Sequence, residues 1–339
     1  MDSGCSSAVP VLYRAVQQGT VRLDGGFTIP TSTFVAVPNK PYLVAPLPDG
    51  VPKSGGFNRG WHNCSNTTRG ELFYGVPTNL QPGVEARHPN VGTDGNWRWM
   101  RQGKTFNSTA FGARQEGGLP IDPSKWATAE SLKTLWVHGF WHFDWTDTYE
   151  RVLSITKPGT VVHGRAKVTT EWTYTIDAVP AYGLSTGSRY YVVRSLTLLD
   201  APNEYIVTND SVYFYPPKTP SITDPGVEVV LSAASRLLTL NSTRYLTFEG
   251  IMFGVARDVA VSIANSTGVI FRNCSIANVG GDALVIDGGA TGNAGVKIDN
   301  THMWGIGCTG ISLKQIGNET SLTPGAVELT NSECTFSHL

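Results

Sequence analysis

Apolar and polar residues alternate in short segments that repeat along the last third of the chain. Four such segments end at a glycine or an asparagine: Leu246–Gly250, Val269–Asn273, Val296–Asn300 and Val327–Asn331. Apolar residues then recur at fixed intervals, as from Phe248 to Phe253 and from Phe253 to Ile263. Three short strands in a repeat of about 20 to 50 residues indicate a solenoid. We therefore predict an all-β chain built on a right-handed parallel β-helix with three strands per coil.

Asparagine recurs at one position of the predicted coil, at Asn273, Asn300 and Asn331, and Gly250 holds this position one repeat earlier. A very short turn between two strands needs a residue in the left-handed conformation, which glycine and asparagine adopt at the lowest cost. We expect the asparagines to stack as a ladder. The alternative is that asparagine is simply common in turns, but the strand spacing and the ladder agree independently.

Composition fits an all-β chain and excludes some partners. The 339 residues include 37 glycines and 20 prolines, and they suffice for one large domain or two. The net charge is −1, and no basic stripe with interleaved aromatics suggests nucleic acid. No run approaches the roughly 18 apolar residues of a membrane span. The sequence gives no indication of the oligomeric state.

The repeat divides the chain into three predicted regions. Residues 1–55 are expected to form N-terminal strands or a first coil, residues 56–226 an inserted antiparallel β domain, and residues 227–339 the β-helix. Within the insertion we predict strands at Arg189–Leu196, Glu204–Thr208 and Val212–Tyr215, the last two forming a hairpin, and one helical stretch near Pro123–Leu135. The sequence stops inside a coil without a polar cap, so we expect the solenoid to be truncated at this end.

The first residues lack the basic and apolar regions of a signal peptide. Acceptor sequences for N-glycosylation begin at Asn63, Asn66, Asn107, Asn209, Asn241, Asn265, Asn273 and Asn318. They permit a secreted glycoprotein, and we expect an extracellular or cell-surface location.

The cysteines Cys274, Cys308 and Cys334 fall in different columns of the coil alignment, and no spacing suggests zinc. We expect them to be small buried residues, and a disulfide that involves Cys5 or Cys64 stays open. We expect neither a cofactor nor a metal.

Several phrases carry a resemblance to a known group of proteins. They are Trp141-His-Phe-Asp-Trp-Thr-Asp147, Arg189–Val192, Leu198–Pro202, Val212–Pro217, and Gly310–Leu313 continuing to Thr320–Gly325. Together they resemble bacterial right-handed β-helix proteins of the pectate-lyase-like superfamily, in particular glycoside hydrolases of the β-xylosidase and α-fucosidase kind with an inserted β domain. This resemblance implies a polysaccharide or oligosaccharide as the partner, and paired carboxylates as the catalytic groups.

The connection after the third strand lengthens from coil to coil, and loops that vary are where binding usually occurs. The sheet beside these loops comprises Val259–Ile263, Asp282–Ile286 and Thr309–Leu313. Its outward residues are expected to be the small ones, which would leave room for a flat ligand: Ala260, Ser262, Ala283, Val285, Gly310 and Ser312. We take Ser262 and Ser312 as candidate substrate-binding residues.

Asp287 is the first catalytic candidate, because it ends a strand at the mouth of the long loops. Glycoside cleavage requires two carboxyl groups about 5–10 Å apart. Asp282 and Glu319 are the candidate partners, and another could lie beyond Leu339. The alternative is that Asp287 is only a turn residue.

Six further side chains complete the set of predicted roles. Lys314 is the neighbour of Asp287 in the alignment, and it and His338 are candidates for substrate binding. Asp299 and Glu328 fall on another sheet and are expected to be solvated. Trp141 and Trp145 could stack on sugar rings, but we favour a core position for them.

The leading hypothesis is a glycoside hydrolase that uses two carboxylates. The alternative is a non-catalytic carbohydrate-binding or cell-surface solenoid. A third is a polysaccharide lyase, which would need a cluster of acids that binds Ca²⁺ and a basic residue.

Overall fold

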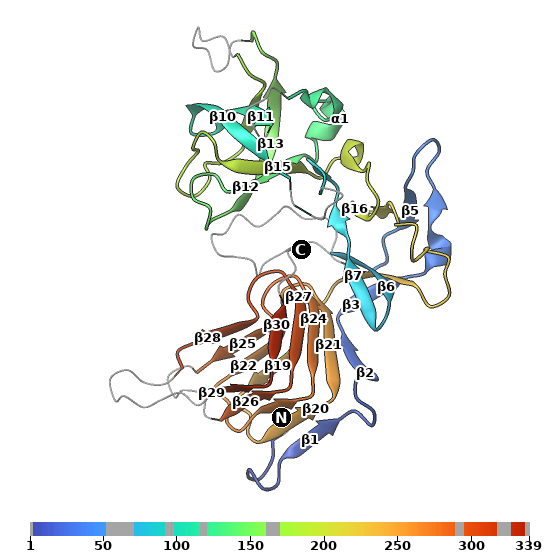
Figure 1. The fold of residues 1–339 in the computed structure, drawn as a ribbon, viewed down its shortest axis with the longest axis vertical. Coiled ribbons are helices and arrows are strands. Elements are labelled where there is room, and N and C mark those ends of the chain that lie inside the picture. The colour runs from blue at the N-terminus through green and yellow to red at the C-terminus, as the bar shows by residue number, and fades with distance from the viewer. Residues whose placement is uncertain are drawn as a thin grey trace.

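The computed structural model describes residues 3–51, 71–91, 96, 98–115, 121–160, 170–288, 295–316 and 327–335. The described chain is nearly all strand. Figure 1 shows a stack of parallel strands in the lower half and a set of antiparallel sheets above and beside it. The predicted architecture, a β-helix with an antiparallel β insertion, is confirmed.

Three parallel sheets form the solenoid in the described part of the chain. The first contains β1 (Val11–Arg14), β20 (Leu246–Glu249), β23 (Ile270–Arg272), β26 (Val296–Asp299) and β29 (Val327–Thr330). The second contains β2 (Val21–Asp24), β21 (Ile251–Ala256), β24 (Ser275–Val279), β27 (His302–Ile306) and β30 (Glu333–Thr335). The third contains β19 (Arg236–Asn241), β22 (Val259–Ala264), β25 (Leu284–Asp287) and β28 (Ile311–Lys314).

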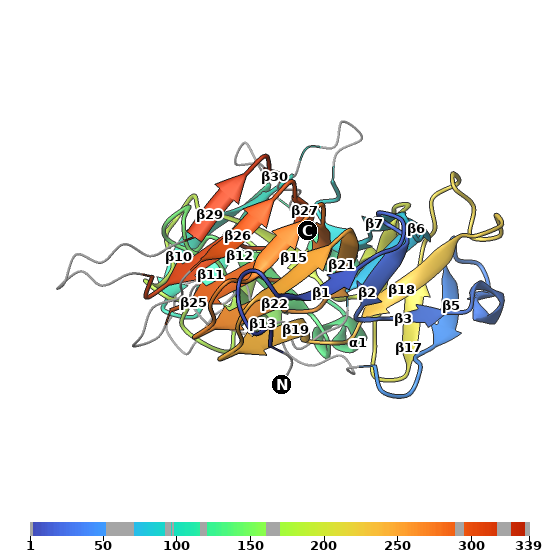
Figure 2. The same cartoon turned by 90° about the horizontal axis from the view of Figure 1, so that it is seen from below.

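The first coil is assembled from two distant parts of the chain. Strands β1 and β2 pair in parallel with β20 and β21. The third strand of this coil is β19, which pairs with β22. Residues between β2 and β19 leave the solenoid and form the antiparallel sheets, and Figure 2 shows β1 and β2 beside β21. The insertion therefore interrupts one coil between its second and third strands.

Apolar side chains of successive coils stack inside the solenoid in the predicted columns. Phe248 aligns with Phe271, and their rings stack 5.0 Å apart. Tyr13 of the first coil extends this stack, with its ring 5.2 Å from that of Phe248. Phe253 and Ile276 align in the second sheet, and both are buried. Because each coil covers the one before it, the repeat produces one continuous core.

The predicted asparagine ladder is present. Asn273, Asn300 and Asn331 have φ angles of 53°, 45° and 51°, and Gly250 has 73°. The amide nitrogen of Asn300 donates to Oδ1 of Asn273 over 2.7 Å. These residues adopt the left-handed conformation that the short turn requires.

The inserted residues include an antiparallel barrel. Its strands follow the order β10 (Met100–Asn107), β11 (Ala110–Gln115), β14 (Thr173–Ile176), β13 (Thr148–Thr156), β12 (Trp136–Gly139), β15 (Arg189–Val193) and β9 (Arg87–His88). Pairing of β10 with β15 closes the sheet. Aromatic side chains fill it, with the rings of Phe111, Trp141, Tyr174 and Tyr190 in mutual contact. Trp141 is a core residue, as predicted.

Two smaller sheets connect the barrel and the solenoid. One has the order β3 (Gly26–Ile29), β18 (Glu228–Ser232), β6 (Leu72–Val76) and β7 (Asn79–Pro82). The other has the order β4 (Val35–Ala36), β5 (Leu43–Pro46), β17 (Ser211–Phe214), β16 (Glu204–Val207) and β8 (Val84–Glu85). The predicted hairpin of residues 204–215 is the antiparallel pair β16 and β17. Strands from residues 1–55 and strands from residues 56–226 lie in the same sheets. The predicted domain boundaries stay a prediction.

Helical structure is short and lies beside the sheets. The stretch predicted near residues 123–135 contains the 3₁₀ turn Pro123–Lys125 and the helix α1 (Ala129–Leu132). Two further 3₁₀ turns occupy Thr31–Thr33 and Leu196–Leu198. No helix in the described residues is long and apolar enough to cross a membrane.

The structure differs from the expectation at several small residues. Ala260, the second residue of β22, and Ala283, directly before β25, are fully buried in the solenoid core instead of facing outward. Cys274 is buried as expected, whereas Cys5 and Cys334 are exposed thiols. Cys308 is bonded in a disulfide.

Candidate active site

The outer face of the third sheet carries small side chains in register. Ser262 aligns with Val285, and Val285 with Ser312. One row further on, Asp287 aligns with Ala264 on one side and with Lys314 on the other. The structure therefore brings Asp287 and Lys314 to neighbouring strands, as the repeat predicts.

Asp287 ends β25, and Asp282 lies two residues before the start of that strand. Extended chain separates the two acids, and their pairing stays a prediction. The other candidate partner, Glu319, and the candidate substrate-binding residue His338 lie outside the described residues.

A different pair of acids meets where the chain turns into the third sheet. Asp258 precedes β22 directly, and Asp282 occupies the equivalent corner of the next coil. The amide nitrogen of Ala260 donates to the carbonyl oxygen of Asp282 over 3.1 Å, which fixes the two corners against each other. Neighbouring strands are about 4.8 Å apart. Adjacent coils therefore bring these two carboxylates close enough for the charge of Asp282 to act on Asp258.

Burial makes this corner electrostatically unusual. Asp282 is only 9% exposed. Removal from water raises the pKa of Asp258, and the nearby charge of Asp282 raises it further. One carboxylate oxygen of each residue, Oδ1, is buried and accepts no hydrogen bond from the described chain. A buried oxygen of this kind requires a proton, a water molecule or a ligand hydroxyl.

Two arginines oppose this effect. Arg236 and Arg257 both lower the pKa of Asp258. Arg257 follows β21, and its Nε donates to the carbonyl oxygen of Ala233 over 3.3 Å. Arg236 begins β19 and aligns with Val259, the residue after Asp258. The acids and the cations together form a compact charged group at one corner of the solenoid.

The inserted region also reaches this corner. Glu71 is buried, and its backbone exchanges hydrogen bonds with Ser232, at 2.8 Å to the hydroxyl and 2.9 Å from the amide nitrogen. A Cβ atom on Gly280 would lie 3.1 Å from Oε2 of Glu71 and 2.5 Å from the carbonyl oxygen of Arg257. Glycine at position 280 therefore allows the close approach of Glu71 to the turn between β24 and β25.

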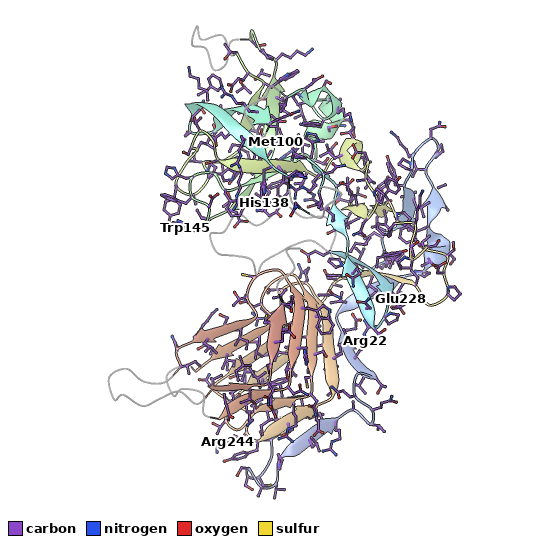
Figure 3. The ribbon with its side chains drawn as sticks, viewed as in Figure 1. Arg22, Met100, His138, Trp145, Glu228 and Arg244 are labelled. Carbon is purple, nitrogen blue, oxygen red and sulfur yellow. The ribbon has the colours of Figure 1, made fainter. Side chains whose placement is uncertain are left out.

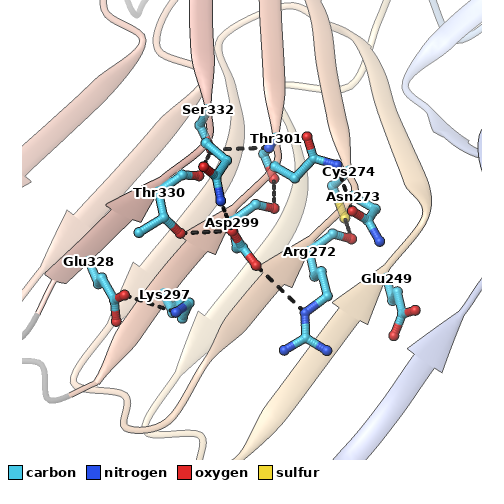
Figure 4. A network of polar contacts seen from close by, with 12 residues as sticks. Glu249, Arg272, Asn273, Cys274, Lys297, Asp299, Thr301, Glu328, Thr330 and Ser332 are labelled. Atoms are coloured by element: carbon cyan, nitrogen blue, oxygen red, sulfur yellow. Dashed lines mark hydrogen bonds and ion pairs between the residues drawn. The ribbon is translucent and has the colours of Figure 1, made fainter.

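The acids of the first sheet serve a different purpose. Figure 4 shows Asp299 beside Arg272, 3.9 Å away, and Glu328 bonded to Lys297 over 2.8 Å. Hydrogen bonds from Thr330 and Asn331 lower the pKa of Asp299. These acids lie on a solvated face, as expected.

Among the described residues, no group of three or more histidines, cysteines or acids could hold a metal ion. The corner acids can act instead as a proton donor and a proton acceptor. Asp282 was predicted from the sequence, but Asp258 was not. The repeat aligns Asp258 with Gly281, so a search for acids in one column misses it. The sequence signal that could have identified Asp258 is the pair of adjacent charged residues, Arg257 and Asp258, at the turn.

The fold of this chain is similar to that of a solved protein. A protein described as a glycoside hydrolase superposes with a TM-score of 0.60 and 15% sequence identity over 90% of this chain. This chain spans 62% of the length of that protein. At this identity the likeness establishes the fold alone.

Other comparisons add little. A second structure is the catalytic domain of a GH87 α-1,3-glucanase, solved with tetrasaccharides. The match covers 87% of this chain and 69% of that chain, at 9% identity. Its TM-score of 0.22 is too low to carry an argument. No protein-family model matches the sequence, and a search of curated proteins finds no relative. Membership in the pectate-lyase-like superfamily therefore stays a prediction.

Proposed function

We propose that this protein is a glycoside hydrolase that cleaves a polysaccharide or an oligosaccharide with Asp258 and Asp282. The observation that carries the proposal is the proximity of these two carboxylates in adjacent coils, each with a buried oxygen that no hydrogen bond from the described chain satisfies. The β-helix supports it, because its long sheet suits a linear polymer. The glycoside hydrolase with the same fold agrees with it.

The environment of each acid suggests its role. Burial raises the pKa of Asp258, which favours a carboxylic acid that donates its proton to the glycosidic oxygen. Asp282 then acts as the carboxylate that activates water or attacks the anomeric carbon. The arginines limit the rise in the pKa of Asp258, so that its proton is still released during the reaction.

The outer face of the third sheet would hold the rest of the sugar chain. Ser262, Ser312 and Lys314 can donate hydrogen bonds to hydroxyl groups. Asp287 lies beside Lys314 and is the second candidate for a catalytic carboxylate, with a partner outside the described residues.

The test is hydrolysis by purified protein of a panel of oligosaccharides and aryl glycosides, with sugar release followed by chromatography. We expect Asp258→Asn and Asp282→Asn to lower kcat by about 10²–10⁴-fold. Asp299→Asn, on the first sheet, is the matched control and should keep full activity.

Asp287→Asn distinguishes the two candidate centres. Loss of activity in this variant, together with full activity in Asp258→Asn and Asp282→Asn, would move the catalytic centre to the other end of the sheet. Absence of hydrolysis by the wild type across the panel, with binding retained, would instead support a non-catalytic carbohydrate-binding solenoid.

A further inference from the structure

Three aromatic side chains gather on the surface of the barrel. Phe143, Trp145 and Tyr182 are 39%, 54% and 51% exposed. The rings of Phe143 and Trp145 stack with their centroids 5.3 Å apart, and the ring of Tyr182 meets both edge-on at 5.4 Å. Trp145 lies at the edge of the barrel in Figure 3. We call these three residues the aromatic surface. Contiguous exposed rings of this size usually mark a binding site.

Two turns hold the aromatic surface in place. In the first turn, the amide nitrogen of Thr146 donates to the carbonyl oxygen of Phe143 over 3.2 Å. In the second, Gly183 donates to Pro180 over 2.9 Å. A bond of 2.8 Å from the amide nitrogen of Ser185 to the carbonyl oxygen of Trp141 ties the two segments together. The rings are therefore ordered before any ligand arrives.

Tyr182 has a φ angle of 64°, which is rare for a bulky residue and strains the backbone. This conformation holds its ring against Phe143 and Trp145. The strain is consistent with a ring that is positioned for binding.

Polar groups flank the rings with almost no net charge. The carboxylate of Asp144 lies 3.1 Å from Nε of Arg189, and its side chain is largely exposed. The guanidinium of Arg189 in turn rests 4.2 Å from the ring centre of Phe140. His142 packs its ring against Phe143 at 4.4 Å. Hydrogen-bonding groups beside exposed aromatic faces suit a ligand with apolar faces and a rim of hydroxyl groups. The paired charges favour a neutral ligand over a polyanion.

We propose that the aromatic surface binds the pyranose rings of a neutral polysaccharide and retains the polymer on the enzyme. Apolar C–H faces of the sugar would stack on Trp145, and the hydroxyl rim would reach Asp144 and His142. The proposal rests on the function proposed above, since it supplies a second contact for the same polymer on a part of the chain separate from the Asp258 and Asp282 corner.

The test is affinity electrophoresis of the full chain in native gels that contain mixed-linkage β-glucan, arabinoxylan or dextran, with polygalacturonate as the anionic control. We expect at least one neutral polymer to retard the wild type, and Trp145→Ala to weaken its apparent affinity by about tenfold or more. Trp145→Phe should restore part of the retardation. Leu153→Ala removes a similarly exposed apolar side chain of the barrel and should bind like the wild type.

Two readouts separate this proposal from the catalytic one. Asp258→Asn should still be retarded, and Trp145→Ala should keep its rate on a short aryl glycoside. Retardation that is the same in Trp145→Ala and the wild type would overturn the proposal, as would no retardation by any neutral polymer. A third outcome is that the wild type sediments as a dimer, that Trp145→Ala sediments as a monomer, and that glycans retard neither. This outcome would assign the aromatic surface to a second copy of the chain instead.

Discussion

The side-chain amide of Asn300 donates a hydrogen bond of 2.7 Å to the side-chain oxygen of Asn273 in the preceding coil. Both residues adopt the left-handed backbone conformation at the turn between the first and second sheets. Asparagine thus performs two tasks at one position. It accepts the unusual backbone, and it connects one coil to the next.

These two tasks can be measured separately. Asn300→Gly keeps the backbone conformation and loses only the side-chain bond, so we expect a loss of about 0.5–1.5 kcal/mol in the free energy of unfolding. Asn300→Ala also pays for a left-handed alanine, about 1–2 kcal/mol more. Urea denaturation of both variants gives the difference. Equal stabilities would show that the backbone conformation is not what selects asparagine here.

The pH dependence of activity should report on the charges around Asp258. A general acid works only while protonated, so activity falls as the pH rises through its pKa. Arg236 lowers this pKa. Arg236→Gln should therefore move the alkaline limb of the kcat/KM profile to higher pH, and Arg236→Lys should restore it.

The neighbouring acid should act in the opposite direction. Asp282 raises the pKa of Asp258. Residual activity in Asp282→Asn should therefore lose its alkaline limb at lower pH than the wild type. Arg14→Gln, on the first sheet, should leave the profile unchanged. A limb that does not move in either direction would argue against Asp258 as the general acid.

Glu204, in β16, should make the stability of the protein depend on pH. Burial raises the pKa of this carboxyl to about 7, from an ordinary value of 4.5. Between these values the folded protein keeps the proton and the unfolded chain releases it. The free energy of unfolding should thus fall as the pH rises from about 4.5 to about 7, by an amount on the order of 3 kcal/mol.

Glu204→Gln should remove this part of the pH dependence, because a glutamine side chain does not titrate. Its side-chain oxygen can still accept from the amide nitrogens of Asp200 and Ala201, so the local structure should be kept. Glu130, which is exposed, provides the control substitution Glu130→Gln. Denaturation midpoints measured at half-unit pH steps decide the matter. A slope that persists in Glu204→Gln would mean that another group is responsible.

A buried hydrogen bond in the barrel core offers a further test. Nε1 of Trp126 donates to the hydroxyl of Tyr174 over 2.7 Å, and both side chains are buried. Tyr174→Phe leaves the indole N–H without its acceptor, and we expect a loss of about 1–3 kcal/mol in the free energy of unfolding. Thermal unfolding measures it. Tyr182→Phe removes a hydroxyl from a half-exposed side chain and should change stability far less.

The solenoid could be predicted because its contacts repeat. Phe248, Phe271 and Ile298 stack on one another, so the spacing of apolar residues in the sequence is the spacing of the coils. The register that places Asp287 beside Lys314 follows from the same periodicity. Local turns add a second signal, since the left-handed positions select asparagine or glycine.

The candidate acid pair and the aromatic surface could not be predicted in this way, because both lie in turns. Along a strand, residues one position apart face opposite sides. Asp258 and Asp282 are offset by one position in the alignment, yet they meet where this alternation does not hold. Trp141 and Trp145 likewise look equivalent in the sequence, but one fills the barrel and the other lies on its surface. The barrel itself depends on pairings between strands that are distant in the sequence, and no repeat in the sequence predicts these pairings.

The interrupted first coil has a consequence for how the chain is made. On the ribosome, β2 emerges early, but its partner β21 and the third strand of its coil, β19, follow only after the whole insertion. At synthesis rates of about 5–20 residues per second, the first strands wait ten seconds or more for their neighbours. The last barrel strand, β15, ends 43 residues before β19 begins. The order of synthesis thus favours folding of the inserted region first. Strands β1 and β2 then pair with the rest of the solenoid afterwards.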